Sequence, residues 1–75
     1  GSREEELKES AEELERSVRE LKKEADKYKE EVDRLHYRGK VDKDWVRVVE
    51  KLIKLVEEHL ELIREHLELL KEERR

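Results

Sequence analysis

The chain has 75 residues, of which 56% are Asp, Glu, Lys or Arg and 33% are hydrophobic, and its formal net charge at pH 7 is −4. A chain of this length forms one small domain at most, and such a domain often needs a metal, disulfides or oligomerisation for stability. It contains no cysteine, which excludes disulfides and thiolate metal sites. With no proline and two glycines, the composition is typical of long helices and coiled coils.

The charge pattern gives no indication of a partner other than the chain itself. Both signs are interspersed, so there is no basic stripe for nucleic acid and no polybasic block for an anionic membrane. No apolar run approaches the ~20 residues that span a bilayer. No signal peptide is recognisable, and Gly1-Ser2 resembles the remnant of an expression tag. We expect a soluble protein with no nucleic-acid partner and no cofactor.

A first helix is expected over residues about 3–38. Its apolar residues recur at alternating steps of four and three, which is the 3.5-residue period of a coiled coil. Ser2 followed by Glu5 fits a capping box, which places the helix start near residue 3. With Leu7 at heptad position d, the apolar columns are Ala11, Val18, Ala25 and Val32 at a, and Leu7, Leu14, Leu21, Tyr28 and Leu35 at d.

A short turn over residues about 39–42 separates this helix from a second one, expected over residues about 43–73. Gly39 can adopt the left-handed conformation that ends a helix. Asp42 is a good N-cap, and Val41 and Val46 flank it at the spacing of a hydrophobic staple. A connection this short makes the two helices antiparallel neighbours, so residues 1–75 form a single helical hairpin.

The second helix has a wider apolar face than the first, because the face takes in four of the seven heptad columns. One hairpin cannot cover a face of this width, and an uncovered apolar patch marks an interface. With Trp45 at d, the columns are Val49, Val56, Ile63 and Leu70 at a, Trp45, Leu52, His59 and His66 at d, Val46, Ile53, Leu60 and Leu67 at e, and Val48, Leu55, Leu62 and Leu69 at g.

We therefore expect an all-α antiparallel hairpin that assembles into a symmetric, coiled-coil-like bundle of identical chains. The second helix would form an inner ring and the first helix an outer ring. A six-helix homotrimer is favoured over an assembly of two or four copies. The residues expected in the oligomer interface are Val49, Leu52, Val56, Leu62, Ile63 and Leu70.

Two histidines, His59 and His66, interrupt the inner apolar column seven residues apart, so they would form two layers about 10 Å apart along the symmetry axis. A buried imidazole needs hydrogen-bond partners, and the second helix has no Ser, Thr, Asn or Gln. The first helix supplies Ser10 and Ser17. The Ser10/His66 and Ser17/His59 pairs have the same index sum, 76, which is close to the sum of about 79 expected for level residues of this hairpin. We expect each layer to be a His–Ser hydrogen-bond network.

Three roles for these layers remain open, and a pH switch is favoured. The layers could instead form a static device that fixes register and oligomer number. Three imidazoles on a threefold axis could also hold zinc, although no HExxH motif or added carboxylate supports this metal site. We expect no enzyme activity, because Glu58 and Glu65 precede the histidines but point elsewhere. His36, near the turn, is expected to have no role beyond the surface.

The sign of the pH response follows from the burial of a neutral group. An imidazole held neutral in a dry layer has a pKa below its ordinary value of about 6.5. Its contribution to stability is present above pH ~6.5 and is lost as the pH falls through the lowered pKa. We therefore expect a cooperative loss of the oligomer below about pH 6.

The regular heptads, the Ser2 and Asp42 caps, the Gly39 turn and the His/Ser layers resemble a de novo designed two-ring helical bundle. More narrowly, they resemble designed pH-responsive homotrimers of helical hairpins with buried histidine hydrogen-bond networks. The resemblance covers the whole chain and implies reversible disassembly on acidification, which in that family can expose apolar faces that disrupt endosome-like membranes. Membrane contact is therefore expected only at acidic pH. His59 and His66 match the switching positions and His36 does not. A designed chain would have no natural location and would be made by recombinant expression in the cytoplasm.

Overall fold

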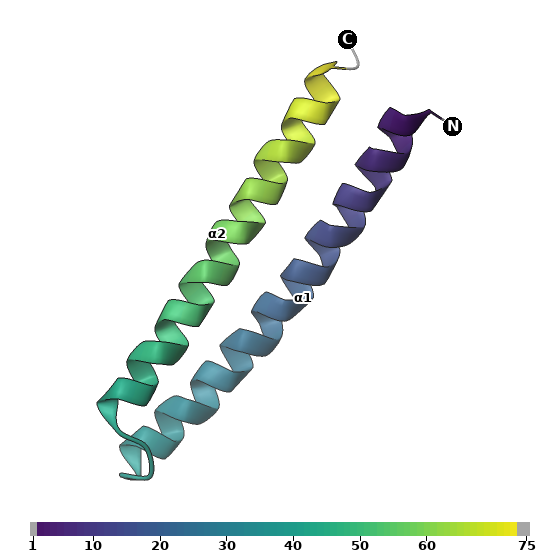
Figure 1. Ribbon diagram of the computed structural model, residues 1–75. Helices are drawn as coiled ribbons and strands as arrows, with labels where there is room; N and C mark the ends of the chain where they lie inside the picture. The colour runs from purple at the N-terminus through teal and green to yellow at the C-terminus, as the bar shows by residue number, and fades with distance from the viewer. Residues whose placement is uncertain (1, 74–75) are drawn as a thin grey trace.

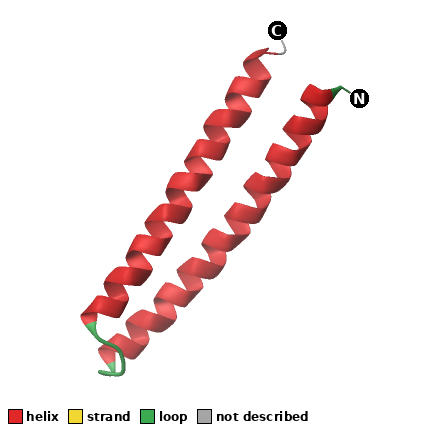
Figure 2. Cartoon of the chain, in the orientation of Figure 1, coloured by secondary structure: helices red, strands yellow, loops and turns green. Residues whose placement is uncertain are grey.

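The computed structural model describes residues 2–73 and shows two antiparallel helices joined by a short loop (Figure 1). Helix α1 comprises Arg3–Tyr37 and helix α2 comprises Lys43–Glu73. The principal extents of the hairpin are 55 × 15 × 12 Å, and the start of α1 and the end of α2 lie at the end opposite the loop. Residues 2–73 contain no strand (Figure 2), so the predicted all-α hairpin is confirmed. The first helix ends one residue earlier than its predicted boundary.

Both ends of α1 are closed by local hydrogen bonds. The Ser2 side chain accepts a hydrogen bond from the backbone N–H of Glu5 at 3.2 Å, as expected for an N-cap. At the other end, Gly39 has a φ of +74°, and its N–H donates to the carbonyl of His36 at 2.9 Å. The N–H of Lys40 donates to the carbonyl of Leu35 at 2.8 Å. These two bonds form a Schellman motif, and the predicted left-handed glycine is confirmed.

The loop leads directly into the cap of α2. Asp42 accepts a hydrogen bond from the N–H of Trp45 at 3.0 Å, so the predicted N-cap is confirmed. The Nδ1 atom of His36 lies 2.9 Å from the carbonyl oxygen of Val41. A carbonyl can only accept, so the imidazole donates its Nδ1–H. His36 was expected to be a surface residue without a further role, but its hydrogen bond to Val41 links the end of α1 to the loop.

The interior of the hairpin is thin and is formed by the a column of α1 and the a and e columns of α2. Small residues dominate the α1 column, so the two helices share few large side chains. The other residues of the three columns are partly buried. The buried hydrophobic residues are Val32, Val49, Leu60, Leu67 and Leu70.

One long edge of the hairpin, the closed edge, is lined by charged residues that complement one another. Lys22 donates to Asp26 at 3.0 Å, which raises the pKa of Lys22, and Glu57 on α2 adds a weaker contribution in the same direction. The pKa of Lys29 is raised by its hydrogen bond to Asp33 and, more weakly, by Glu50 on α2. In both cross-helix pairs the residue numbers add up to 79, the register expected from the position of the turn.

Candidate interface and histidine site

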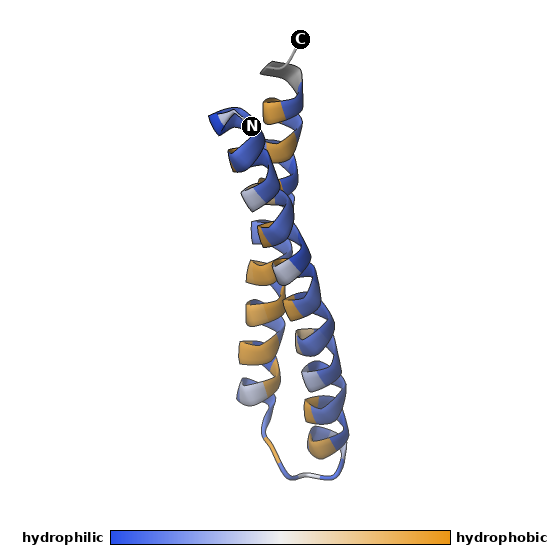
Figure 3. Ribbon diagram, turned by 90° about the vertical axis from the view of Figure 1, so that its right-hand side faces the viewer, coloured by the Kyte–Doolittle hydropathy of each residue, from blue (hydrophilic) through white to orange (hydrophobic). Residues whose placement is uncertain are grey.

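The long edge opposite the closed edge is apolar and uncovered. Its large apolar side chains, most of them leucine, are 37–61% exposed. Figure 3 shows hydrophobic segments recurring along α2 for most of its length. We name three columns on this apolar face. They are the α1 outer column (Leu7, Leu14, Leu21, Tyr28 and Leu35), the α2 histidine column (Trp45, Leu52, His59 and His66) and the α2 outer column (Val48, Leu55, Leu62 and Leu69).

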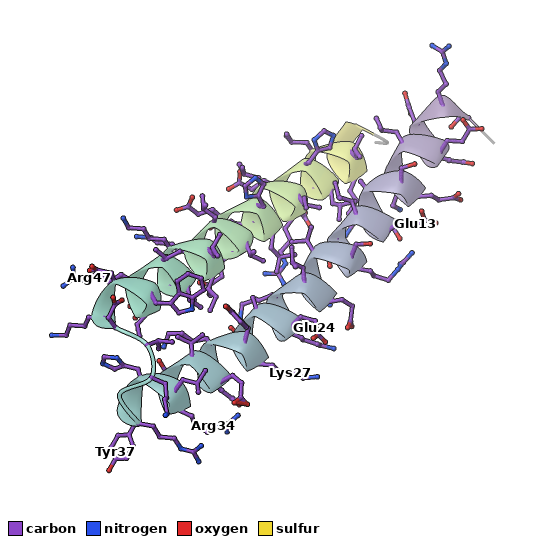
Figure 4. All side chains as sticks on the ribbon, turned by 60° about the horizontal axis from the view of Figure 1, so that its bottom comes forward. Glu13, Glu24, Lys27, Arg34, Tyr37 and Arg47 are labelled. Carbon is purple, nitrogen blue, oxygen red and sulfur yellow. The ribbon has the colours of Figure 1, made fainter. Side chains whose placement is uncertain are left out.

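The side of α1 that faces away from α2 is charged and forms its own ion pairs. Glu24, Lys27 and Arg34 extend from this side (Figure 4). Lys27 lies 3.7 Å from Glu24, and Arg34 donates to Glu31 at 2.7 Å. Arg34 lowers the pKa of the Glu31 carboxyl through this hydrogen bond and through its charge. An apolar partner would therefore approach the apolar face and not this side.

A groove runs between the helices along the apolar face, and both histidines line it. Leu14, Leu62 and Ile63 line both of its sections, so the groove is continuous. The section near the chain ends is also lined by Leu7, Ser10, Ala11 and His66. The middle section is also lined by Val18, Leu21, Leu52, Leu55, Val56 and His59.

One ring nitrogen of His59 has a hydrogen-bond partner that was not predicted. Its Nδ1 atom lies 2.7 Å from the carbonyl oxygen of Leu55, one turn earlier in α2. Because a carbonyl only accepts, Nδ1 carries a proton, and in the neutral imidazole the free lone pair is then on Nε2. The lack of Ser, Thr, Asn and Gln in α2 therefore does not leave this imidazole without a partner in its own helix, because the backbone carbonyl of Leu55 accepts its hydrogen bond. His59 remains exposed in the single hairpin.

The two predicted His–Ser pairs are placed differently. Ser10 and His66 line the same section of the groove, whereas the section around His59 is lined without Ser17. Both serines and both histidines are exposed in the single hairpin. Among residues 2–73 there is no hydrogen bond between either serine and either histidine. The single chain therefore brings one pair into the same groove but completes neither network.

The six residues expected in the oligomer interface fall into three groups. Leu52 and Leu62 are 52% and 61% exposed, so they are open to a partner. Val56 and Ile63 are partly buried at the floor of the groove. Val49 and Leu70 are 2% and 9% exposed, so the hairpin itself already covers them. Sequence reasoning did not single out the α1 outer column for a partner, although its d spacing was visible.

No group of three or more His, Cys, Asp or Glu in the described part of the chain could hold a metal ion. Within residues 2–73, neither helix has the length and apolar character needed to cross a membrane. Comparison of the chain with protein families, curated proteins and solved structures finds no match.

Proposed function

We propose that the chain is a self-assembling helical hairpin whose apolar face is covered by further copies of itself. The observation that carries this proposal is the exposure of eleven large apolar side chains on one face, each at least 37% exposed. A monomeric protein rarely leaves a contiguous apolar surface of this kind open to water. A six-helix homotrimer, with α2 inside and α1 outside, is favoured because α2 carries two uncovered columns and α1 carries one.

In this assembly His59 and His66 face the symmetry axis and make the oligomer sensitive to acid. In His59, the Nδ1–H already binds the carbonyl of Leu55, so a second proton would place an additional N–H donor in an apolar layer. A buried donor without an acceptor costs about 1–3 kcal/mol, and like charges converging on the axis add to this cost. The assembly is therefore most stable above pH ~6.5, and its stability decreases as the pH falls below this value.

The resemblance to designed bundles supports a designed origin for the chain. At each of three helix ends, the Ser2 cap, the Gly39 turn and the Asp42 cap provide hydrogen bonds to backbone groups that the helix leaves unpaired, as is standard in designed helices. We assign no catalytic role to any residue. Release of the apolar face on acidification would allow contact with a membrane at low pH only.

Sedimentation equilibrium at pH 7.5 and pH 5.0, with EDTA in both buffers, tests the proposal. We expect a single trimer mass at pH 7.5 and a shift toward the hairpin mass at pH 5.0. An oligomer that is unchanged at pH 5.0 would reduce the function to static self-assembly. The double variant His59→Asn/His66→Asn is the control and should lose most of the pH dependence. Dissociation of this variant at the same pH as the unmodified chain would rule out the histidines as the sensor.

The tautomer of His59 favours a divalent metal site as a second candidate function. Metal-bound histidines usually donate their other ring N–H to a carbonyl or carboxylate, which matches the bond between His59 and Leu55. Three copies would bring three free Nε2 atoms to the axis, a donor set that suits Zn²⁺ with one open position. Adding Zn²⁺ at pH 7.5 should then raise the thermal stability of the oligomer. His59→Asn should abolish this effect and His66→Asn should not.

A further inference from the structure

The α1 outer column is an apolar surface that its own α2 does not use. Leu7, Leu14 and Leu21 are 51–53% exposed, whereas the neighbouring a column of α1 lies against α2 and is buried or partly buried. On a helical wheel, positions a and d diverge by about 60°. The α1 outer column is therefore turned from its own α2 toward a different neighbour.

The α2 outer column is likewise turned away from its own α1. Its four residues are 50–61% exposed, and Leu62 and Leu69 are more exposed than any leucine of the α1 outer column. Position g lies about 120° from position a, which packs against α1, so the single hairpin cannot cover this column. The two outer columns are therefore the outermost apolar rows of the hairpin, one on each helix.

The two outer columns are in register with each other over four heptads. The pairs Leu7/Leu69, Leu14/Leu62, Leu21/Leu55 and Tyr28/Val48 all have an index sum of 76. Level residues of the hairpin have an index sum of 79, as in Lys22/Glu57, so each of these pairs is offset along the axis by less than one helical turn. A second hairpin placed beside the first, with the same axial position and direction, can therefore match every residue of one column with a residue of the other.

We propose that the α1 outer column of each chain docks on the α2 outer column of the next chain. The contact is heterologous, since one copy contributes α1 and the other contributes α2, and it closes into a ring. This inference rests on the proposed self-assembly and specifies its contact surface.

Charged and polar residues beside the two columns complement each other at three of the four levels in the same arrangement. The row beside the α1 column contains Ser10, Ser17, Glu24 and Glu31, and the row beside the α2 column contains Glu65, Glu58, Lys51 and Asp44 at the matching levels. Serine thus stands where the next chain presents Glu65 or Glu58, and Glu24 stands where it presents Lys51. At the fourth level Glu31 and Asp44 are both acidic, and each lies near an arginine of its own helix, Arg34 at 2.7 Å and Arg47 at 3.6 Å. The serines therefore have a second role beside the histidine layers, because they avoid carboxylate repulsion between copies.

The pair Glu24/Lys51 is informative because it cannot form within one hairpin. Heptad position g of α1 and position c of α2 point away from each other in the same chain. Glu24 lies 3.7 Å from its own Lys27 and is 69% exposed, and among the described residues Lys51 has no ion-pair partner. Both side chains are therefore available to a neighbouring copy.

Cysteine pairing tests the proposed contact, since the chain has no cysteine of its own. The single variants Leu21→Cys and Leu55→Cys are mixed in denaturant, refolded together at pH 7.5 and oxidised. We expect a disulfide between the two variants, seen as a dimer on a denaturing gel. The matched control is a mixture of Leu21→Cys with Leu69→Cys, in which the two positions are about 21 Å out of register. The control should give little heterodimer.

The same mixtures are weighed by sedimentation equilibrium before oxidation. A monomeric mass would overturn the proposed self-assembly and this contact with it. An oligomeric mass without the expected disulfide, or with an equal yield in the control mixture, would overturn the heterologous contact alone.

Charge exchange provides a second test that leaves the apolar columns intact. In Glu24→Lys we expect the concentration at which half of the chains assemble to rise about threefold, and Glu24→Lys/Lys51→Glu should restore it. Glu24→Lys also removes the ion pair with Lys27 inside α1, but residues 24 and 51 cannot meet within one hairpin, so restoration by the second substitution indicates that they meet between copies. If the double variant assembles no better than Glu24→Lys, the proposed pairing of the flanking rows is wrong.

Discussion

At Gly39 the backbone has a φ of +74°, a region that L side chains rarely adopt. A Cβ atom at this position would meet no atom within 4 Å, so a substitution is opposed by backbone strain and not by a clash. We expect Gly39→Ala to lower the free energy of unfolding by about 1 kcal/mol. Urea denaturation followed by circular dichroism measures this change. Gly39→Asn should cost less, because asparagine tolerates the left-handed region, and an equal cost would argue against backbone strain.

Glu31 provides an acid-sensitive contact that differs from the histidines in its pH range. Arg34 lowers the pKa of the Glu31 carboxyl, first through a hydrogen bond and then through its charge. The ordinary pKa of a glutamate carboxyl is about 4.3. A carboxyl whose pKa is lowered in the fold stabilises the fold at pH values above this ordinary pKa, and the stabilisation is lost as the pH falls through the lowered pKa. Carboxyl NMR should give Glu31 a pKa below this value, and Arg34→Gln should raise it.

This ion pair cannot explain a transition near pH 6, because Glu31 stays ionised there. If Arg34→Gln moved the dissociation of the oligomer near pH 6, the assignment of that transition to His59 and His66 would be wrong. If the pKa of Glu31 did not change in Arg34→Gln, the hydrogen bond at 2.7 Å would have no influence in solution.

At the scale of the helices, the sequence predicts the features that depend on residues close together in the chain. Ser2, Gly39 and Asp42 act within three or four residues of their own positions, so their roles and the helix ends could be read directly. The hairpin also followed from the short turn. The burial of Val49 and Leu70 against α1 could not be read from the heptads, because columns a, d, e and g of α2 are all apolar and the pattern does not say which of them the first helix covers.

The heptads predicted the face on which His59 and His66 lie, but not the bonding of His59. The heptad spacing placed His59 and His66 on the apolar face, and the structure has both lining the groove. The bond from His59 to the carbonyl of Leu55 depends on a side-chain rotamer, which a residue pattern does not specify. The heptads likewise do not specify that Ser10 lines the groove beside His66 while Ser17 is absent from the section around His59.

The two kinds of apolar column should respond differently to truncation. Val32 is 1% exposed within the hairpin, so Val32→Ala should lower the stability by about 2 kcal/mol at every protein concentration. Leu14 is 53% exposed, so Leu14→Ala should weaken the assembly and leave the dilute hairpin almost unchanged. Thermal melts recorded over a range of concentrations separate the two effects. A loss of helix in Leu14→Ala at dilutions where the unmodified chain is already monomeric would contradict this separation.

At the scale of the whole molecule, charge is distributed unevenly along the rod. The end farthest from the loop, which we call the open end, comprises residues 3–20 and 57–71 and has 13 acidic and 6 basic residues. The loop end, residues 22–54, has 8 acidic and 11 basic residues. His59 and His66 lie in the open end. A ring of parallel hairpins therefore brings several acidic ends together around the histidine layers, whereas an antiparallel pair would place acidic and basic ends side by side.

This asymmetry predicts that salt strengthens the assembly at neutral pH. Raising NaCl from about 0.05 M to about 0.5 M shortens the screening length to a few ångströms, which weakens the repulsion between parallel open ends. We expect the concentration of half-assembly at pH 7.5 to fall several-fold over this range. Sedimentation velocity across a dilution series measures it. Salt also weakens the attraction between Glu24 and Lys51 of neighbouring copies, which would raise the concentration of half-assembly. This effect is smaller, because it concerns one ion pair, whereas each open end carries seven uncompensated negative charges.

The variant Glu13→Gln/Glu61→Gln provides the control, since it removes two charges from the open end without altering the apolar face. It should assemble at a lower concentration than the unmodified chain in low salt and should show a weaker response to NaCl. An antiparallel assembly would behave in the reverse way, because screening would remove the attraction between unlike ends. A half-assembly concentration that rises with NaCl would therefore exclude the parallel ring, and with it the histidine layers that only a parallel arrangement can form.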